Sequence, residues 1–358
     1  MRWRNAHLGT VSPLLAVLTL SLGWGLALLP SMGISAQEPP ESDRVEPSPQ
    51  APRVDPLTPE EPTTDTVEPE NPLVLDISRR EAITVAERLA QYYEAKVPLP
   101  PVLAPLGRLD ATLNMEDAFY LRDALVNQLT PELGRIVGYK AGLTSPPAQA
   151  RFGVDHPLRG LLLSEMLLES GATVPANVGA RPLVEADLMV RVGSVAINHA
   201  TTREEAIAAL DAVIPFIELP DLLLEPDIQP TAADLVAINV GARSGVMGTP
   251  IPLTPRPDGR SWLEVLGDTP VEMVNPVTGD VIAQGNTQAL LGHPLEAVLW
   301  LVEDLQASGQ WLHIGDVLSL GSITMPLPLE PNQTIRLQYH NLGPDGSTAT
   351  VSVTVAPL

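Results

Sequence analysis

Hydrophobic positions recur at helical spacing in two early stretches of the chain, 78–96 and 114–129. Ser78 and Glu81 form a capping box at the start of the first stretch, and Asn114 is the capping residue of the second. The pattern therefore predicts two helices, which we expect to lie on the surface of the core.

Beyond Arg135 the pattern changes to short β-rich runs bounded by Gly and Pro. The predicted strands are 136–143, 183–192, 212–219, 271–274, 280–284, 317–320, 334–339 and 349–355. Helices are predicted between them at 202–212 and at 294–307, and Gly309 closes the second. The succession is typical of an α+β fold with a largely antiparallel or mixed sheet. Because no G-x-G-x-x-G or G-x-x-x-x-G-K-[ST] motif occurs, a nucleotide-binding fold has no support.

The N-terminus has the composition of a targeting segment. Arg2 and Arg4 precede the uncharged stretch 14–29, and small residues follow up to Ala36. Residues 1–36 therefore predict a signal peptide, with an uncleaved N-terminal membrane anchor as the alternative. We expect the protein to be exported to the periplasm or anchored to the membrane. The chain contains no cysteine, which excludes a lipoprotein anchor, disulfides and cysteine-based metal sites.

Residues 37–75 contain ten prolines and ten acidic residues. Such a stretch cannot bury enough apolar surface to fold, so it is predicted to be a disordered tether. The domain that folds is expected to be 76–358, with 76–134 as its helical N-terminal part. The formal net charge of −22 counts against a nucleic acid as partner, because phosphate binding requires a basic surface.

The first candidate chemistry is a set of three acids in two apolar runs. Glu185 and Asp187 are two residues apart, so on a strand their side chains lie on the same face, and Glu218 follows in the next predicted strand. Three converging carboxylates would suit a hard divalent cation such as Mg²⁺ or Mn²⁺. The alternative is that the acids alternate along the wet face of a half-exposed strand.

A second candidate is Lys140, which lies at the end of an apolar strand between Gly138 and Gly142. A partly desolvated lysine in this place would suit acid–base work or the binding of an anionic substrate. The alternative is a lysine that extends from the strand end into water. Asp155 follows in a turn-like segment, where it could instead bond backbone amides.

Six motifs in order resemble one known family. They are 137–145 (VGYKAGLTS), 152–160 (FGVDHPLRG), 181–187 (RPLVEAD), 215–219 (PFIEL), 291–295 (LGHPL) and 315–322 (GDVLSLGS). Together they resemble the 2-keto-4-pentenoate hydratases and 4-oxalocrotonate decarboxylases of the fumarylacetoacetate hydrolase superfamily, over roughly 77–355. The resemblance implies a mixed β-sandwich roll with peripheral helices, like the C-terminal domain of fumarylacetoacetate hydrolase.

The resemblance also assigns roles to residues of this chain. It implies that Mg²⁺ or Mn²⁺ is bound by Glu185, Asp187 and Glu218, and that Lys140 and Asp155 are catalytic residues in the pocket for a 2-oxo acid. The implied substrate-binding residues are Gly321, Ser322 and Asn239.

Two positions depart from the family. Asp187 replaces the usual glutamate and is one methylene shorter, so either the geometry of the metal site shifts or a water fills the gap. Ile238 replaces an aspartate, which removes a polar group near the expected pocket.

These residues lead to a functional hypothesis with two alternatives. We expect a metal-dependent hydratase of 2-hydroxy-2,4-dienoate or 2-oxo-4-enoate acids, in which the cation stabilises an enolate. The same stabilisation would serve a 2-oxo acid decarboxylase, and an exported, catalytically weakened binding protein for an anionic metabolite is the other alternative. We further expect a homo-oligomer.

The histidines offer little additional chemistry. His293 begins a predicted helix, where a structural role is favoured, while His156 next to Asp155 is a candidate for the pocket. No H-E-x-x-H metal motif and no G-x-S-x-G nucleophile motif is present.

Overall fold

The computed structural model describes residues 77–109 and 111–357. The predictions of a signal peptide and an acidic tether fall on residues outside this part. No helix among the described residues is long and apolar enough to cross a membrane.

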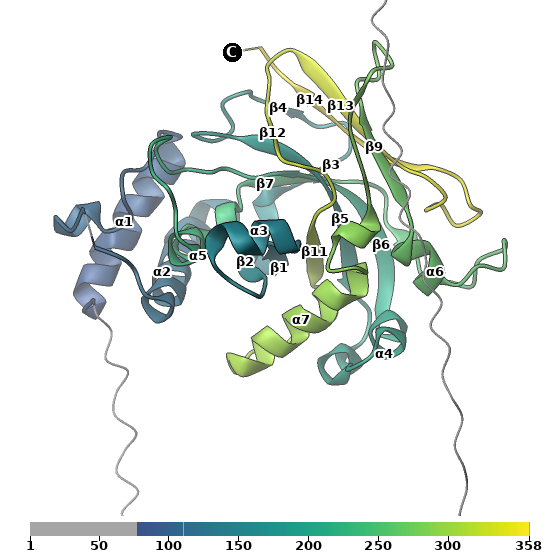
Figure 1. Ribbon diagram of the computed structural model, residues 1–358, viewed down its shortest axis with the longest axis horizontal. Helices are drawn as coiled ribbons and strands as arrows, with labels where there is room; N and C mark the ends of the chain where they lie inside the picture. The colour runs from purple at the N-terminus through teal and green to yellow at the C-terminus, as the bar shows by residue number, and fades with distance from the viewer. Residues whose placement is uncertain (1–76, 110, 358) are drawn as a thin grey trace, which may run out of the picture. The chain divides into compact units, whose positions relative to one another are not determined.

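Seven α-helices and fourteen strands make up the described part (Figure 1). The helices are α1 (Arg79–Ala95), α2 (Met115–Leu133), α3 (Pro146–Phe152), α4 (Arg203–Ala208), α5 (Ala232–Ala237), α6 (Trp262–Gly267) and α7 (Pro294–Ala307). The strands are β1 (Ile136–Gly142), β2 (Leu158–Leu163), β3 (Leu167–Glu169), β4 (Thr173–Val174), β5 (Leu183–Val192), β6 (Leu210–Leu219), β7 (Ser244–Met247), β8 (Ile251–Pro252), β9 (Pro270–Val274), β10 (Val281–Asn286), β11 (Val317–Ser322), β12 (Leu327–Pro328), β13 (Gln333–Tyr339) and β14 (Ala349–Val355).

The strands form a nine-stranded and a five-stranded sheet. The larger sheet has the order β2-β1-β11-β5-β6-β7-β3, with β12 beside β5 and β8 beside β6, and the smaller has the order β10-β9-β13-β14-β4. Most neighbours are antiparallel, but β1 runs parallel to β11, β3 to β7, and β14 to β4. The predicted mixed sheet is therefore confirmed.

The two faces of the larger sheet differ in chemistry. Along β5, Val184, Leu188 and Val190 enter the main apolar core, which also receives Leu337 and Val353 from the smaller sheet. Residues of β5 at the intervening positions, including the two predicted metal ligands, lie on the opposite face. The sandwich core thus fixes which side chains β5 presents on its other face.

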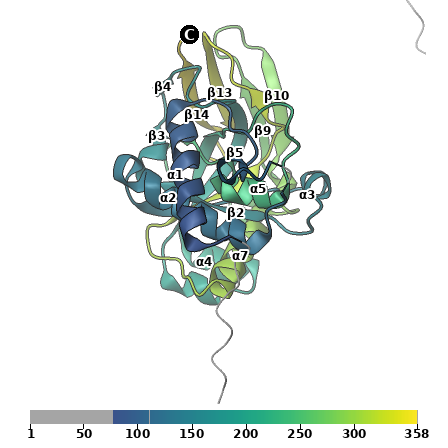
Figure 2. The same ribbon diagram turned by 90° about the vertical axis from the view of Figure 1, so that its left-hand side faces the viewer.

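A second apolar cluster joins the N-terminal helices to the sheet. It contains Val85 and Leu89 of α1, Leu121 of α2, Val236 of α5 and Leu161 of β2. Figures 1 and 2 show α1 and α2 side by side at one edge of the fold, while α7 and α4 lie together at another place. The helical part predicted for 76–134 is therefore packed onto the strand next to β1.

Most predicted elements appear close to their expected ends. The capping box of Ser78 and Glu81 opens α1, and the Asn114 side chain caps α2, which continues four residues past the predicted end at Leu129. The helix predicted for 202–212 was wrong at its C-terminal end. It stops at Ala208, because the chain from Leu210 onward pairs with β5.

Several elements were not predicted, and β2 is the most important of them. All six residues of β2 are buried, including Arg159, which contacts Asp304, Ser308 and Gln310 around the end of α7. An apolar run interrupted by arginine and glycine lacks the alternation that marks a half-exposed strand. The remaining unpredicted elements are two to seven residues long.

His293 has the structural role that the sequence favoured. Its imidazole is buried at the N-cap of α7, where Nδ1 accepts a hydrogen bond from the Leu295 amide at 3.1 Å. Nε2 lies 3.1 Å from the Leu263 carbonyl, to which the neutral ring donates. Burial lowers the pKa of His293 below its usual value, because the charged form loses hydration.

This lowered pKa predicts a loss of stability in acid. Below pH of about 6.5 the unfolded state binds the proton first, so the free energy of unfolding contributed by His293 falls as the pH decreases. His293→Asn keeps a capping acceptor without titrating. We expect its melting temperature to fall less than that of the parent between pH 7 and pH 5, as measured by thermal unfolding. His313→Asn, at an exposed position, is the control. Equal acid sensitivity of the parent and His293→Asn would contradict the assignment.

Candidate active site

The three predicted acidic ligands come together on one face of the larger sheet. Glu185 and Asp187 lie on β5, and Glu218 lies on β6 directly opposite Glu185 in the strand register. Asp187 is 0% exposed and Glu218 is 5% exposed. The alternative of a wet, half-exposed strand face is therefore wrong for Asp187 and Glu218.

Lys140 belongs to the same cluster. It is 4% exposed, its Nζ forms an ion pair with Glu218 Oε1, and Nζ donates a second hydrogen bond to the Val240 carbonyl at 3.1 Å. Burial alone would lower the pKa of Lys140, but the carboxylates of Glu218 and Glu185 outweigh burial and raise it. The lysine is therefore a buried cation held by acids, and the alternative of a lysine that extends into water is wrong.

A glycine makes room for the lysine. Gly160 of β2 lies opposite Lys140, and a Cβ at Gly160 would be 2.9 Å from Lys140 Cγ and 2.9 Å from the Asn239 carbonyl oxygen. Any side chain at Gly160 would therefore displace the stem of the lysine.

The segment that supplies the Val240 carbonyl has an unusual backbone. Asn239, Val240 and Gly241 all have left-handed φ angles, of 58°, 52° and 67°. For a β-branched residue such as Val240 this conformation costs about 1–3 kcal/mol, so the surroundings must hold it. The Asn239 amide does so in part, since its Oδ1 accepts from the Leu161 amide at 2.7 Å and its Nδ2 donates to the Leu161 carbonyl at 2.9 Å.

Asp187 is held at both carboxylate oxygens. Its Oδ2 accepts a hydrogen bond from the Ser319 hydroxyl of β11, and its Oδ1 accepts one from the Leu188 amide at 2.5 Å. The buried Tyr339 hydroxyl donates to the Asp187 carbonyl and accepts from the Phe216 amide at 3.2 Å. Tyr339 comes from the smaller sheet, so a side chain from the sandwich core enters the β5–β6 pairing at Asp187.

The electrostatics of the acids reflect their crowding. Burial raises the pKa of Glu185 to about 7, the charge of Glu218 adds to this rise, and Lys140 and the Ser322 hydroxyl oppose it. Burial and Glu218 likewise raise the pKa of Asp187 well above its usual value, against the hydrogen bond from Ser319. Close carboxylates that share little water cannot all ionise cheaply without a further cation.

The donor set fits a divalent cation in its chemistry. Glu185, Asp187 and Glu218 offer hard oxygen ligands, which would carry three negative charges against the single positive charge of Lys140 when all are ionised. As the side chains stand, no group of three or more His, Asp or Glu residues within 77–109 and 111–357 is arranged to hold a metal ion. In this arrangement Glu218 forms an ion pair with Lys140, so one of its carboxylate oxygens already has a partner.

Two further predicted residues border this cluster. Gly321 has a φ of +107°, and a Cβ there would lie 2.1 Å from Thr144 Oγ1, so only glycine fits. Ser322 follows an irregularity in the β11–β5 pairing, and its hydroxyl interacts with Glu185 and donates to the Thr324 carbonyl. Bulges of this kind re-aim side chains beside functional sites.

Other predicted residues lie apart from the buried cluster. Asp155 is exposed in the turn after α3, and its catalytic role stays a prediction. His156 is exposed as well, with Nδ1 2.7 Å from the Pro157 carbonyl. The Asn239 side chain braces β2, so its substrate-binding role also stays a prediction.

Sequence reasoning missed three contributors to the cluster: Ser319, Val240 and Tyr339. Ser319 carried a readable signal, because it is a hydroxyl within the apolar strand 317–320. Val240 and Tyr339 carried no such signal. Val240 acts through its main-chain carbonyl, and the Tyr339 side chain contacts the main chain of a distant strand.

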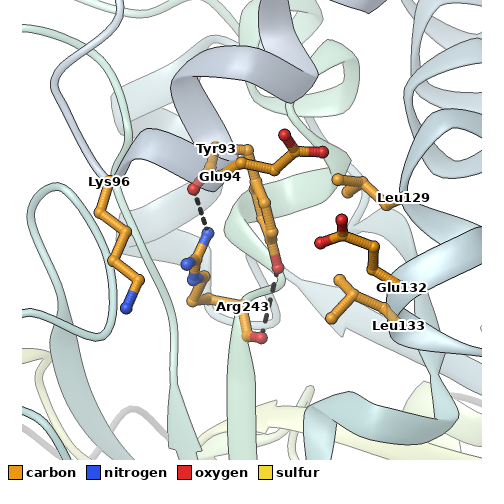
Figure 3. A pocket seen from close by; sticks show the side chains of 7 residues that line it. All are labelled: Tyr93, Glu94, Lys96, Leu129, Glu132, Leu133 and Arg243. Carbon is orange, nitrogen blue, oxygen red and sulfur yellow. Dashed lines mark hydrogen bonds between the residues drawn. The ribbon is translucent and has the colours of Figure 1, made fainter.

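A cavity of about 190 Å³ lies elsewhere, lined by α1, by α2 and by Arg243, the residue before β7 (Figure 3). Tyr93 and Arg243 line it, and the guanidinium carbon of Arg243 is 3.9 Å from the centre of the Tyr93 ring. Arg243 donates to the carbonyls of Tyr93 at 2.6 Å and Val178 at 2.7 Å. These contacts explain Arg243 as a structural residue that joins α1 to β7.

The chain is similar in sequence and in fold to known enzymes. Over 258 residues the chain is 28% identical to the 2-keto-4-pentenoate hydratase of Paraburkholderia xenovorans. The aligned region covers 72% of this chain and 91% of that protein. It is 27% identical over 232 residues to a 4-oxalocrotonate decarboxylase of Pseudomonas putida, with coverage of 64% and 84%. No protein-family profile matches the chain.

A solved structure confirms the fold. The 4-oxalocrotonate decarboxylase of Pseudomonas putida G7, solved with magnesium and adipate, superposes with a TM-score of 0.65 at 24% identity. The superposition covers 78% of this chain and 99% of that one. The predicted β-sandwich roll and the predicted resemblance to the 2-keto-4-pentenoate hydratase and 4-oxalocrotonate decarboxylase family are thus confirmed.

Proposed function

We propose that this protein is a hydro-lyase that adds water to 2-hydroxy-2,4-dienoate or 2-oxo-4-enoate acids and depends on Mg²⁺ or Mn²⁺. The observation that carries the proposal is the cluster of Lys140 with Glu185, Asp187 and Glu218 on one face of the larger sheet. The proposal is also supported by relatives with 28% identity, which are named 2-keto-4-pentenoate hydratases.

The proposed metal ligands are Glu185, Asp187 and Glu218. When bound, the cation supplies Lewis acidity for the 2-oxygen of the substrate and balances the excess negative charge of the cluster. A cation held by Glu218 would compete with the ion pair between Glu218 and Lys140. Lys140 would then present its ammonium group to an anionic substrate.

The remaining chemistry consists of proton transfers. Ketonisation of the dienol moves one proton from the 2-hydroxyl oxygen to the terminal carbon, and water then adds its oxygen at C4 and a proton at C3. With its ammonium group directed at the anionic substrate, Lys140 would serve as a hydrogen-bond donor and acid. The Val240 carbonyl holds Nζ in place while its other partner changes. Asp155 stays the proposed partner for protons at the exposed side, and Gly321, Ser322 and Asn239 stay proposed substrate contacts.

A decarboxylase of 2-oxo acids is the second candidate, since relatives at 27% identity carry that name. Loss of CO₂ would use the same stabilisation of charge on the 2-oxygen. Assays with 2-hydroxypenta-2,4-dienoate and with 4-oxalocrotonate distinguish the two reactions. Tight binding of both acids without turnover of either would instead favour a binding protein.

The proposed metal site predicts weaker Mn²⁺ binding when a ligand is neutralised. We expect Glu218→Gln and Glu185→Gln each to lower Mn²⁺ affinity at least about tenfold in calorimetry, because a charged ligand is lost. Glu169→Gln, at an exposed position on β3, should bind like the parent. Unchanged affinity in both site variants would show that the site is misassigned.

We expect Lys140→Met to lose turnover. It should keep metal binding, because the proposed metal ligands lie on other strands. If the lysine handles protons, we expect kcat to fall about 10²–10⁴-fold. A smaller effect confined to KM would indicate an anchor for the substrate carboxylate. Lys96→Met changes the other lysine of the chain and is the control. Full activity of Lys140→Met would refute its proposed role.

We also propose that the protein works outside the cytoplasm, released or held by its N-terminus, as a homo-oligomer. The support for export is the order of Arg2, the apolar stretch 14–29 and small residues up to Ala36. We expect cell fractionation to recover the protein outside the cytosol, and N-terminal sequencing of a released form to begin near Gln37. Soluble cytosolic protein that retains residues 1–36 would contradict export.

A further inference from the structure

Ser319 is a buried hydroxyl in an apolar strand. It is 0% exposed, and its neighbours Val317, Leu318 and Leu320 are buried in apolar clusters. A hydroxyl in such a place costs free energy unless it is hydrogen-bonded. Its hydrogen bond goes to Oδ2 of Asp187 on the adjacent strand.

The partner of Ser319 is the acid that departs from the family pattern. Asp187 is one methylene shorter than Glu185 and Glu218, so its carboxylate stays closer to its own strand. There it meets the Ser319 hydroxyl at one oxygen and the Leu188 amide at the other. The main chain at the same residue is fixed by the Tyr339 hydroxyl. Asp187 therefore has little freedom to rotate.

We propose that Ser319 is a positioning residue, whose hydroxyl fixes the Asp187 carboxylate in the orientation that completes the metal site. Each carboxylate oxygen can accept more than one partner, so Oδ2 remains available for a cation while it accepts from Ser319. Hydrogen bonds from outside the ligand set commonly orient metal ligands in this way. The inference rests on the proposed metal site and gives a reason for the pairing of a shorter acid with a nearby hydroxyl.

Mn²⁺ binding to the full-length protein, measured by calorimetry, tests the inference. We expect Ser319→Ala to weaken Mn²⁺ affinity about 10–100-fold, the usual effect of removing such a partner. Ser319→Cys fills a similar volume with a weak donor and should also bind more weakly than the parent, which covers the case that the alanine variant does not fold. Ser308→Ala removes a hydroxyl that contacts Arg159 and the Asp304 carbonyl, and it should leave Mn²⁺ affinity unchanged.

A double-mutant cycle separates positioning from a general structural effect. Asp187→Glu moves the carboxylate beyond the Ser319 hydroxyl, so in that background Ser319→Ala should change Mn²⁺ affinity less than about threefold. An equal loss in both backgrounds would show a structural role and overturn the proposal. Parent-like affinity in Ser319→Ala or Ser319→Cys would also overturn it and leave the metal site standing. If the parent binds no Mn²⁺, the proposed function and this inference are both wrong.

Discussion

The structure depends on a cluster of three carboxylates and one lysine on a single face of the larger sheet, in which Asp187, Glu218 and Lys140 are buried and Glu185 is partly buried. Lys140 neutralises Glu218, but Glu185 and Asp187 remain, and burial raises the pKa of both. Buried charge of one sign in excess is unfavourable for the fold itself. Proteins keep such groups where a ligand or a metal uses them, which is why this cluster and not the cavity beside Arg243 is the centre of the proposed chemistry.

The rest of the fold holds this cluster in place. The sandwich core fixes the face of β5, and the Tyr339 hydroxyl enters the β5–β6 pairing from the smaller sheet. On the other side, the left-handed segment at Val240 brings a carbonyl to Lys140, and Gly160 leaves room for the lysine stem. The acids and the lysine are therefore positioned by rigid elements, as a site that must keep its geometry requires.

The sequence predicted the parts of the molecule in which local pattern and tertiary structure agree. Strand β5 was predicted with its observed ends because it is a β-rich apolar run bounded by Pro182 and Gly193. The acids of 183–192 could be placed on one face because side chains two residues apart on a strand point to the same side. Strand β2 was not predicted because it is buried on both faces and its sequence shows no alternation. The contacts of Ser319 and Val240 could not be predicted because their partners lie 100 or more positions away in the chain. The family resemblance supplied the metal, which spacing alone left open.

The position of bound Mn²⁺ in crystals of the protein, located by anomalous diffraction, tests the central claim most directly. The account predicts a peak between Glu185 and Glu218, in contact with Asp187, and it predicts that Lys140 has left Glu218. A peak at any other place, or an intact Lys140–Glu218 ion pair at saturating Mn²⁺ without a peak beside it, would contradict the account.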